Sequence, residues 1–425
     1  MRLELKNVGV IENAEIDIDA ITVIAGRNST GKSTVGKMLF CIFNSLYMVE
    51  EQIAIERISS IEKIFHSAYQ SITNKPIRFI NAEDAIKILI ANKSAPANTI
   101  NSIKGLLIKT LVQYDPTFQA TADKEKLDGA ANSIKHILDI TDHELLTAIL
   151  QKRMSAEFNM QINNFHHPDK ESEITLEIKG TAVQIIVREN DNVDITNGLS
   201  LNTEAIYIDD PYAIDSPRLP ASLSPKGFNT HRDHLRINLA KESTPSIKET
   251  LEEIVAAKRL SRVFERLNTV CPGEIVNNTG RSFSYEDRKA NALIDTVNVS
   301  TGLKTFVIIK KLLLNGCLEM NGTIILDEPE IHLHPEWQLV FAELIVLLQI
   351  EFNMHILINT HSPYFLDALE VYSQKHGNAE KCRYYISEIA DSTAEIYDVT
   401  GDTEQIYEKL GRPFQDLENE RYAGE

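Results

Sequence analysis

The segment from Gly26 to Thr34 most constrains how this chain can fold, because it fits the phosphate-loop pattern G-x-x-x-x-G-K-[ST]. Residues 21–25 predict a short buried strand before it, and residues 33–43 predict a helix with one apolar face after it. This setting suits a phosphate loop, since backbone N–H groups at a helix N-terminus point towards a bound phosphate. The sequence therefore predicts a nucleotide-binding site on a strand–loop–helix unit.

Each residue type in this loop has a physical role in holding a nucleotide together with Mg²⁺. Gly26 and Gly31 let the backbone approach the phosphates, and Lys32 brings a positive charge to the outer phosphates. The Ser33 hydroxyl is an oxygen ligand of the kind that Mg²⁺ prefers. We therefore expect ATP and Mg²⁺ as cofactors, with Lys32 also taking part in catalysis. The expected contacts to the nucleotide in this loop are Gly26, Arg27, Asn28, Ser29, Thr30, Gly31, Lys32, Ser33 and Thr34.

A second motif consists of the apolar residues 323–326, which are followed by two adjacent carboxylates, Asp327 and Glu328. This pattern predicts a buried strand that ends in two acids. If the strand runs beside the phosphate loop, Asp327 lies next to a Mg²⁺ ion held by Ser33, and these two residues form the expected metal site. Glu328 is then placed to orient and deprotonate the water that attacks the γ-phosphate.

The sequences Leu-Asp-Glu-Pro-Glu at 326–330 and His-Leu-His-Pro at 332–335 resemble the Walker B motif and the D-loop of ABC-type ATPases. The resemblance is strongest to the branch that contains the OLD, RecF, Rad50 and SMC-like heads, the AAA15/AAA21-like ATPases. It implies that His332 and His334 lie in a loop at a dimer interface. We favour that interpretation over a zinc site built from the same histidines.

Residues 298–304 are similar to the signature loop of this family and come immediately before a predicted helix. The resemblance implies that Ser300 and Gly302 contact the γ-phosphate bound by the opposite subunit. A serine hydroxyl and a glycine backbone at a helix N-terminus are chemically suited to that contact.

His361 follows a predicted buried strand, in the sequence Thr-His-Ser-Pro, and resembles the H-loop histidine of the same family. The resemblance implies a catalytic position near the γ-phosphate, and a strand end is where a doubly wound sheet places its ligands. The motifs do not assign the Q-loop glutamine of the family, and Gln52 is the candidate for it.

The resemblance covers about the first 45 residues and those from about 290 to 400. It implies an α/β fold, a split ABC-type ATPase head with a mostly parallel core sheet, an antiparallel N-terminal lobe and a large insertion that contains helices and strands. The expected division has an N-terminal part of the head with the phosphate loop, a mainly helical insertion that ends in a β-hairpin, a connecting region, and a C-terminal part of the head. These parts span residues 1–45, 46–200, 201–290 and 291–425.

Composition limits the class of protein and its location. A chain of 425 residues with 43% hydrophobic residues can bury an ample core, and its apolar runs are too short to span a membrane. We expect a cytoplasmic protein with no membrane partner. The net charge of −18 disfavours nucleic-acid binding over the whole surface, although a local basic groove is compatible with it. About sixty residues follow His361, which we expect to be too few for the nuclease domain that follows the OLD heads.

The family resemblance implies an ATP-dependent homodimer or higher homo-oligomer, in which nucleotide closes the interface and hydrolysis opens it. The chain resembles the ATPase subunits of bacterial antiphage defence systems, so we expect a regulatory ATPase that controls a separate nuclease or toxin effector. Three alternatives stay open: a RecF/SMC-like repair ATPase that binds DNA, a nucleotide-sensing scaffold with little turnover, and the ATPase subunit of a membrane transporter. Nucleic acid is left open as a partner.

Two further polar clusters occur in the central region. His231 and His234 lie one turn apart in a predicted helix, and we expect surface or capping roles for them. Arg259, Arg262 and Arg266 have helical spacing. A solvated helix face is the favoured interpretation, and contact with a phosphate backbone is the alternative.

Overall fold

A computed structural model describes the chain in two compact units, which we treat separately. The head unit comprises residues 1–47 and 150–425, and the insertion unit comprises residues 48–149. The described residues are 1–75, 82–91, 99–119, 123–196, 198–215, 230–241, 250–278, 282–287 and 291–422.

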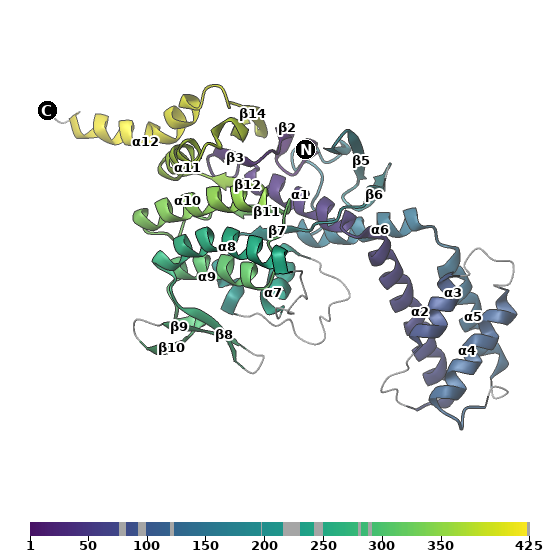
Figure 1. Ribbon diagram of the computed structural model, residues 1–425. Coiled ribbons are helices and arrows are strands. Elements are labelled where there is room, and N and C mark those ends of the chain that lie inside the picture. Colours follow the sequence, from purple (N-terminus) through teal and green to yellow (C-terminus); the bar gives the residue numbers. More distant parts are fainter. Residues whose placement is uncertain are drawn as a thin grey trace. The chain divides into compact units, whose positions relative to one another are not determined.

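An 11-stranded sheet forms the framework of the head unit, with the strand order β6-β5-β4-β1-β2-β14-β13-β3-β12-β11-β7 (Figure 1). The strands in chain order are β1 (Arg2–Val8), β2 (Ile11–Asp17), β3 (Ile21–Gly26), β4 (Ser172–Ile178), β5 (Thr181–Arg188), β6 (Asn192–Ile195), β7 (Ala205–Ile208), β11 (Thr323–Asp327), β12 (His355–Thr360), β13 (Cys382–Ala390) and β14 (Thr393–Asp398).

This sheet has a parallel part and an antiparallel part. Strands β13, β3, β12, β11 and β7 pair in parallel, whereas β6, β5, β4, β1 and β2 pair in antiparallel fashion. Strands β3, β7, β11 and β12 are buried along almost their whole length, because helices cover both of their faces, as is usual in α/β folds. The expected α/β architecture, a parallel core sheet joined to an antiparallel N-terminal lobe, is confirmed.

The order of the core strands corrects one expectation. The strand that ends in Asp327 does not run beside the strand of the phosphate loop, because β12 lies between β11 and β3 and pairs with both. All three strands run in the same direction, so their carboxyl ends meet at one edge of the sheet. That edge is where the predicted motifs assemble.

Two helical layers enclose the parallel strands. Helix α1 (Lys32–Leu46) contacts β3, β12, β11 and β7 on one face. The other face packs against a large apolar cluster that includes Phe306, Phe341 and Phe365. The described head-unit helices after α1 are the last part of α6 (Asp142–Glu157), η1 (Pro211–Asp215), α7 (His231–Ala240), α8 (Thr250–Val270), η3 (Thr296–Asn298), α9 (Thr301–Leu314), α10 (Pro335–Phe352), α11 (Pro363–Lys375), η4 (Ala379–Lys381) and α12 (Glu404–Tyr422).

A second, 3-stranded sheet in the head unit consists of β8 (Glu274–Asn278), β9 (Ser282–Asp287) and β10 (Ala292–Asp295) (Figure 1). Its strands are antiparallel. The buried residue Phe283 on β9 belongs to the large apolar cluster of the head unit. This small sheet directly precedes η3 and the N-terminus of α9, so it leads into the predicted signature loop.

The insertion unit is helical. It contains α2 (Val49–Thr73), α3 (Glu83–Ala91), α4 (Ile100–Tyr114), α5 (Lys124–Asp139) and the first part of α6 (Asp142–Glu157). Its own core includes Phe65, Leu107 and Ile134, all fully buried. The helices bury these residues at three- and four-residue steps, as an amphipathic helix does. Among the described residues of the chain, no helix is long and apolar enough to cross a membrane.

The hairpin formed by β4 and β5 belongs to the large sheet, because β4 pairs along its length with β1. The sequence alone predicts that this hairpin belongs to the insertion, which is expected to end at residue 200. The contacts of the chain instead return to the head unit at residue 150. The cause is a long-range strand pairing, for which no local pattern exists in the sequence.

Candidate nucleotide-binding site

The phosphate loop joins the end of β3 to the N-terminus of α1, as its sequence predicts. Gly31 precedes the first helical residue with φ +91°, a conformation that strains any residue with a Cβ atom. A Cβ atom on Gly26 would lie 2.5 Å from the Ser387 carbonyl oxygen on the neighbouring strand β13. Both glycines are therefore required by the backbone of the loop itself.

Lys32 folds back over this loop. Its Nζ donates hydrogen bonds to the carbonyl oxygens of Gly26 at 2.9 Å and Arg27 at 2.7 Å. Burial lowers the pKa of Lys32, although the nearby carboxylates of Glu328 and Asp327 act in the opposite direction. The amine is thus a buried donor that two backbone carbonyl oxygens hold against the loop.

A pocket opens over the loop, and its lining mixes polar groups with two apolar side chains. Phe165, which the sequence analysis missed, has 57% of its surface exposed and lines this pocket. Its backbone N–H donates to the Gly9 carbonyl oxygen, which places the ring beside the head-unit strands. An exposed aromatic ring next to a phosphate loop is chemically suited to a nucleobase. The lining residues are Val10, Asn28, Ser29, Thr30, Gly31, Lys32, Ser33, Thr34, Phe165 and Glu328.

Asp327 ends β11 and is held by hydrogen bonds to both of its carboxylate oxygens. Its Oδ2 accepts from the Tyr207 hydroxyl at 2.7 Å, and its Oδ1 accepts from Asn359 Nδ2 at 2.9 Å. These donors come from the two strands that flank β11, namely β7 and β12. The carboxylate is therefore fixed from both sides.

Glu328 leaves the strand with φ +48°, and its N–H donates to the Asn359 carbonyl oxygen at 2.8 Å. This turn directs the side chain towards the loop. Glu328 Oε1 lies 3.9 Å from Lys32 Nζ and 3.3 Å from His361 Nδ1. Residues from the phosphate loop, the Walker B segment and the H-loop segment thus meet at one point, although they are far apart in the sequence.

Glu330 occupies a different environment from Glu328. Its Oε1 accepts hydrogen bonds from the Thr360 hydroxyl at 2.5 Å and from the His361 N–H at 3.4 Å. Burial raises the pKa of Glu330 despite these hydrogen bonds. The side chain is only 2% exposed, so it anchors the backbone of the H-loop segment and is poorly placed to reach a solvent water.

The predicted signature residues line a separate pocket with the D-loop. Ser300 is exposed and precedes α9 without a capping hydrogen bond from its side chain. A Cβ atom on Gly302 would lie 2.7 Å from the His332 carbonyl oxygen, so only glycine permits this close contact. None of the residues that line this pocket also lines the pocket over the phosphate loop. They are Ser300, Thr301, Gly302, His332, His334, Glu336 and Trp337.

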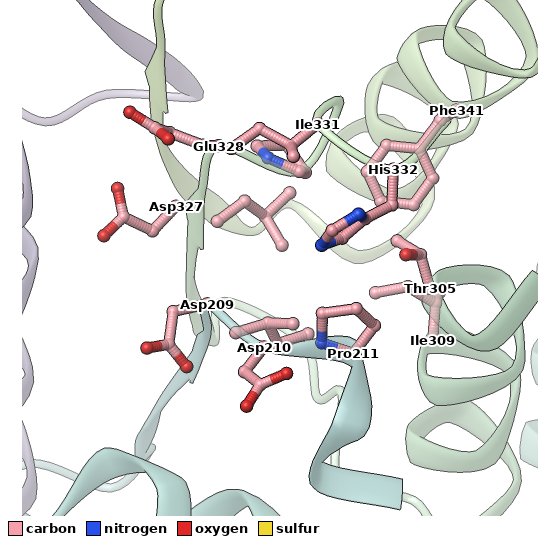
Figure 2. Close-up of a pocket in the computed structure, with 13 residues that line it drawn as sticks. Asp209, Asp210, Pro211, Thr305, Ile309, Asp327, Glu328, Ile331, His332 and Phe341 are labelled. Atoms are coloured by element: carbon pink, nitrogen blue, oxygen red, sulfur yellow. The ribbon is translucent and has the colours of Figure 1, made fainter. Parts of the chain in front are cut away.

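Figure 2 shows a third pocket, between the ends of β7 and β11 and helix α9. Ile208 pairs with Leu326, so the next residues, Asp209 and Asp327, are neighbours at the carboxyl ends of their strands. Their carboxylates point to the same side of the strands in Figure 2. No described residue that lines this pocket or the pocket over the loop is a glutamine. The candidate Q-loop residue Gln52 lies instead in α2 of the insertion unit.

The residues present fit a nucleotide with Mg²⁺. The glycine positions of the loop and the donor set of Lys32 suit a phosphate chain, which binds at helix N-termini. Ser33 and Asp327 supply a hydroxyl and a carboxylate, the hard oxygen ligands that Mg²⁺ prefers. Ser33 is exposed and lines the pocket over the loop.

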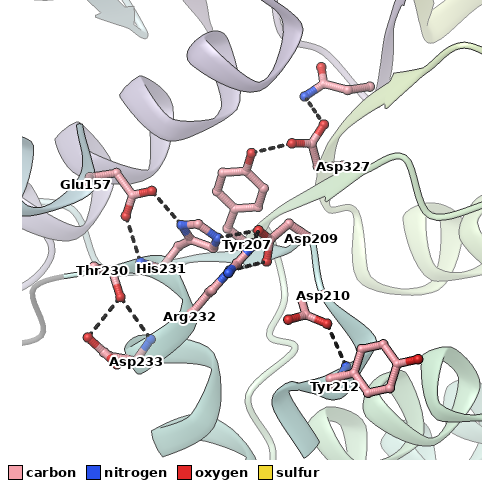
Figure 3. Close-up of polar contacts among 11 residues, drawn as sticks. Glu157, Tyr207, Asp209, Asp210, Tyr212, Thr230, His231, Arg232, Asp233 and Asp327 are labelled. Carbon is pink, nitrogen blue, oxygen red and sulfur yellow. Dashed lines mark hydrogen bonds and ion pairs between the residues drawn. The ribbon is translucent and has the colours of Figure 1, made fainter. Parts of the chain in front are cut away.

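The central histidines are not surface residues, so that expectation is wrong. His231 and His234 are 4% and 3% exposed. His231 Nδ1 lies 2.5 Å from Glu157 Oε1, and its Nε2 lies 3.0 Å from Asp209 Oδ2, as Figure 3 illustrates. The helix cap is Thr230, whose side chain accepts from the backbone of α7. Acidic partners from distant segments bury these rings, and the sequence around the histidines carries no sign of them.

The arginine stripe on α8 is partly neutralised within the head unit. Arg262 Nη1 lies 2.6 Å from Glu351 Oε1, and Arg266 Nε lies 2.9 Å from Glu343 Oε2. Both carboxylates belong to α10. Two of the three arginines therefore have acidic partners, which weakens the interpretation that the stripe follows a phosphate backbone.

Comparison with known proteins places the chain in a family. The family model of the AAA ATPase domain matches residues 1–366, which is most of the chain. The chain belongs to this ATPase family. The match confirms the resemblance to AAA15-like ATPases that the motifs indicated.

Among curated relatives of this ATPase, the probable ATPase of retron Ec83 from Escherichia coli is 27% identical over 262 residues. The match covers 57% of this chain and 47% of the relative, so the aligned part spans about half of that protein's length. Similar solved structures include the SMC head domain from Thermotoga maritima, at 12% identity and a TM-score of 0.35, covering 94% of this chain and 98% of that chain. A Pyrococcus furiosus Smc head domain bound to the C-terminal domain of ScpA has 11% identity and a TM-score of 0.41, covering 99% and 98%.

Proposed function

We propose that this ATPase hydrolyses ATP at the point where Glu328 meets Lys32 and His361. The observation that carries the proposal is the position of Glu328 Oε1, 3.9 Å from the loop lysine and 3.3 Å from the histidine ring. Lys32 holds the outer phosphates, and Glu328 orients and deprotonates the attacking water, with His361 beside it. Mg²⁺, held by Ser33 and Asp327, would supply charge stabilisation at the phosphates when bound.

We further propose that the complete site forms between two copies of the chain. Ser300 and Gly302 line a pocket with the D-loop and share no lining residue with the pocket over the phosphate loop. The exposed Ser300 hydroxyl, at a helix N-terminus without a cap, is a free donor for an anion brought by a second copy. In a two-fold dimer each copy then supplies both halves, one to each of two sites.

Mixing two inactive variants tests this arrangement. Lys32→Ala removes the phosphate-loop amine, and Ser300→Arg blocks the exposed signature position, so we expect neither protein alone to hydrolyse ATP. In a mixed dimer one site combines both defects, while the other combines an intact phosphate loop with an intact signature loop. We therefore expect an equimolar mixture to regain on the order of a quarter of the wild-type ATPase rate.

The matched control is a mixture of Lys32→Ala with a second phosphate-loop variant, Ser33→Ala. Both changes then affect the phosphate-loop half of the site. Each phosphate loop in the mixed dimer carries one of the two changes, so neither of its two sites is intact. If the Lys32→Ala and Ser300→Arg mixture is no more active than this control, the site lies within one copy and the dimer proposal is wrong.

For the biological role, we propose a regulatory ATPase that controls a separate nuclease or toxin effector in antiphage defence. Two observations support this over a DNA-binding repair ATPase. A curated relative is named as the probable ATPase of a retron. In addition, Arg262 and Arg266 are paired with carboxylates of α10, which leaves less free positive charge on the stripe for DNA.

A pull-down of tagged Glu328→Gln protein from its native host, with ATP present, distinguishes these roles. Half of the sample is treated with nuclease before elution, and both halves are analysed by mass spectrometry. We expect a stoichiometric protein partner that survives nuclease treatment. Recovery of DNA, lost on digestion and with no protein partner, would instead support the repair ATPase.

A further inference from the structure

Tyr207 connects the Walker B carboxylate to a buried polar cluster that the proposed reaction does not use. The tyrosine lies on β7, the edge strand of the parallel core, and its side chain has no exposed surface. Its hydroxyl donates to Asp327 Oδ2 at 2.7 Å. Figure 3 shows the ring extending from β7 so that the hydroxyl points at this carboxylate.

The ring of Tyr207 is held on three sides. A Cβ atom on Gly36 of α1 would lie 3.3 Å from the ring Cζ and from the hydroxyl oxygen, so the phosphate-loop helix packs directly on the phenol. Phe40, one turn further along α1, contacts the ring edge-on with a centroid distance of 6.4 Å. The third side is covered by His231, whose ring stacks on Tyr207 at 4.3 Å and an interplanar angle of 24°.

His231 is itself fixed by carboxylates from two other elements. Glu157 of α6 contacts both the Nδ1 atom of the ring, at 2.5 Å, and the backbone N–H, at 2.8 Å. Asp209, just after β7, lies 3.0 Å from the other ring nitrogen. Contacts at both nitrogens restrict rotation of the His231 ring, which in turn restricts movement of the Tyr207 ring stacked on it.

We propose that Tyr207 is a positioning residue for the metal-binding carboxylate: its hydroxyl fixes the orientation of Asp327 from the side opposite to Asn359. A carboxylate has about four lone-pair sites, so one hydrogen bond to each oxygen of Asp327 fixes its plane and leaves one site on each oxygen for a metal ion. Such outer hydrogen bonds orient the ligands of a metal ion, and their loss typically lowers metal affinity or activity by about 10–100-fold. Gly36 and Phe40, which contact the Tyr207 ring, belong to the phosphate-loop helix. The Tyr207 ring therefore also sets the position of the Asp327 carboxylate relative to Ser33 at the start of that helix.

This inference rests on the proposed nucleotide site, and the test separates the two. The Tyr207→Phe change is made in the Glu328→Gln protein, which is expected to keep ATP intact. Binding of Mn²⁺ to its ATP complex is measured by electron paramagnetic resonance, and binding of a fluorescent ATP analogue is measured separately in EDTA. We expect Tyr207→Phe to raise the Mn²⁺ dissociation constant about tenfold or more while leaving binding of the nucleotide in EDTA unchanged.

Tyr385→Phe is the matched control, because Tyr385 is also buried in the large sheet but its hydroxyl accepts from the Asp17 N–H, away from the site. It is expected to leave the Mn²⁺ affinity unchanged. Equal Mn²⁺ affinity for Tyr207→Phe and the parent protein would overturn the positioning role, as would equal losses in both tyrosine variants. If Lys32→Ala bound the nucleotide in EDTA as tightly as the parent protein does, the proposed site itself would be wrong.

Discussion

Replacing Lys32 with alanine is expected to weaken ATP binding by about a hundredfold or more. The side chain is the buried cation of the pocket over the loop, and its Nζ already lies within hydrogen-bond distance of two carbonyl oxygens of that loop. A charge-assisted hydrogen bond to a phosphate contributes about 1.5–3 kcal/mol, and the amine can make more than one. We therefore expect the dissociation constant for ATP to rise by about a hundredfold or more, measured by isothermal titration calorimetry.

Lys37→Ala provides the control for this measurement. Lys37 lies on the same helix but does not line the pocket over the loop, so its loss removes an equal charge from α1 without touching the site. We expect its ATP affinity to stay within about twofold of wild type, because Lys37 does not line the pocket and salt screens the interaction between solvent-accessible charges. A folded Lys32→Ala protein that bound ATP as tightly as Lys37→Ala would show that the nucleotide site has been assigned to the wrong segment.

The motifs that the sequence predicted are those whose residues are contiguous. Gly31 and Lys32, or Asp327 and Glu328, depend on a strand, a turn and a helix start that are each set by neighbouring residues. These motifs could therefore be identified from short stretches of the sequence. The strand order was less accessible, because the placement of β12 between β3 and β11 depends on pairings between segments that are distant in the chain.

The supporting residues of the site were missed for a related reason. Tyr207 reaches Asp327 only because β7 pairs in register with β11, and Glu157 reaches His231 only through the packing of α6 and α7. The sequence shows the spacing of His231 and His234. A histidine in a polar helix can be either buried or exposed, so this spacing does not predict burial. Their acidic partners, Glu157 and Glu204, lie many residues earlier in the chain.

Replacing Glu328 with glutamine is expected to stop hydrolysis while retaining ATP binding. Glutamine is nearly isosteric, so the turn at φ +48° and the N–H donation to Asn359 are preserved. The amide cannot accept a proton from water, and loss of a general base typically costs about 10²–10⁴-fold in rate. We expect the single-turnover rate to fall by that amount, with the ATP dissociation constant within about threefold of wild type.

The same variant should accumulate as an ATP-bound dimer, because a site that closes on ATP and cannot hydrolyse it has no route to the open state. Mass photometry with and without ATP measures this directly, and Glu265→Gln, an exposed carboxylate on α8, is the matched control. Glu330 offers the decisive comparison, since its buried carboxyl already accepts hydrogen bonds from the Thr360 hydroxyl and the His361 N–H. If Glu330→Gln slowed hydrolysis with the fold intact while Glu328→Gln did not, the catalytic base would be Glu330. The contacts of Glu328 with Lys32 and His361 would then contribute to nucleotide binding only.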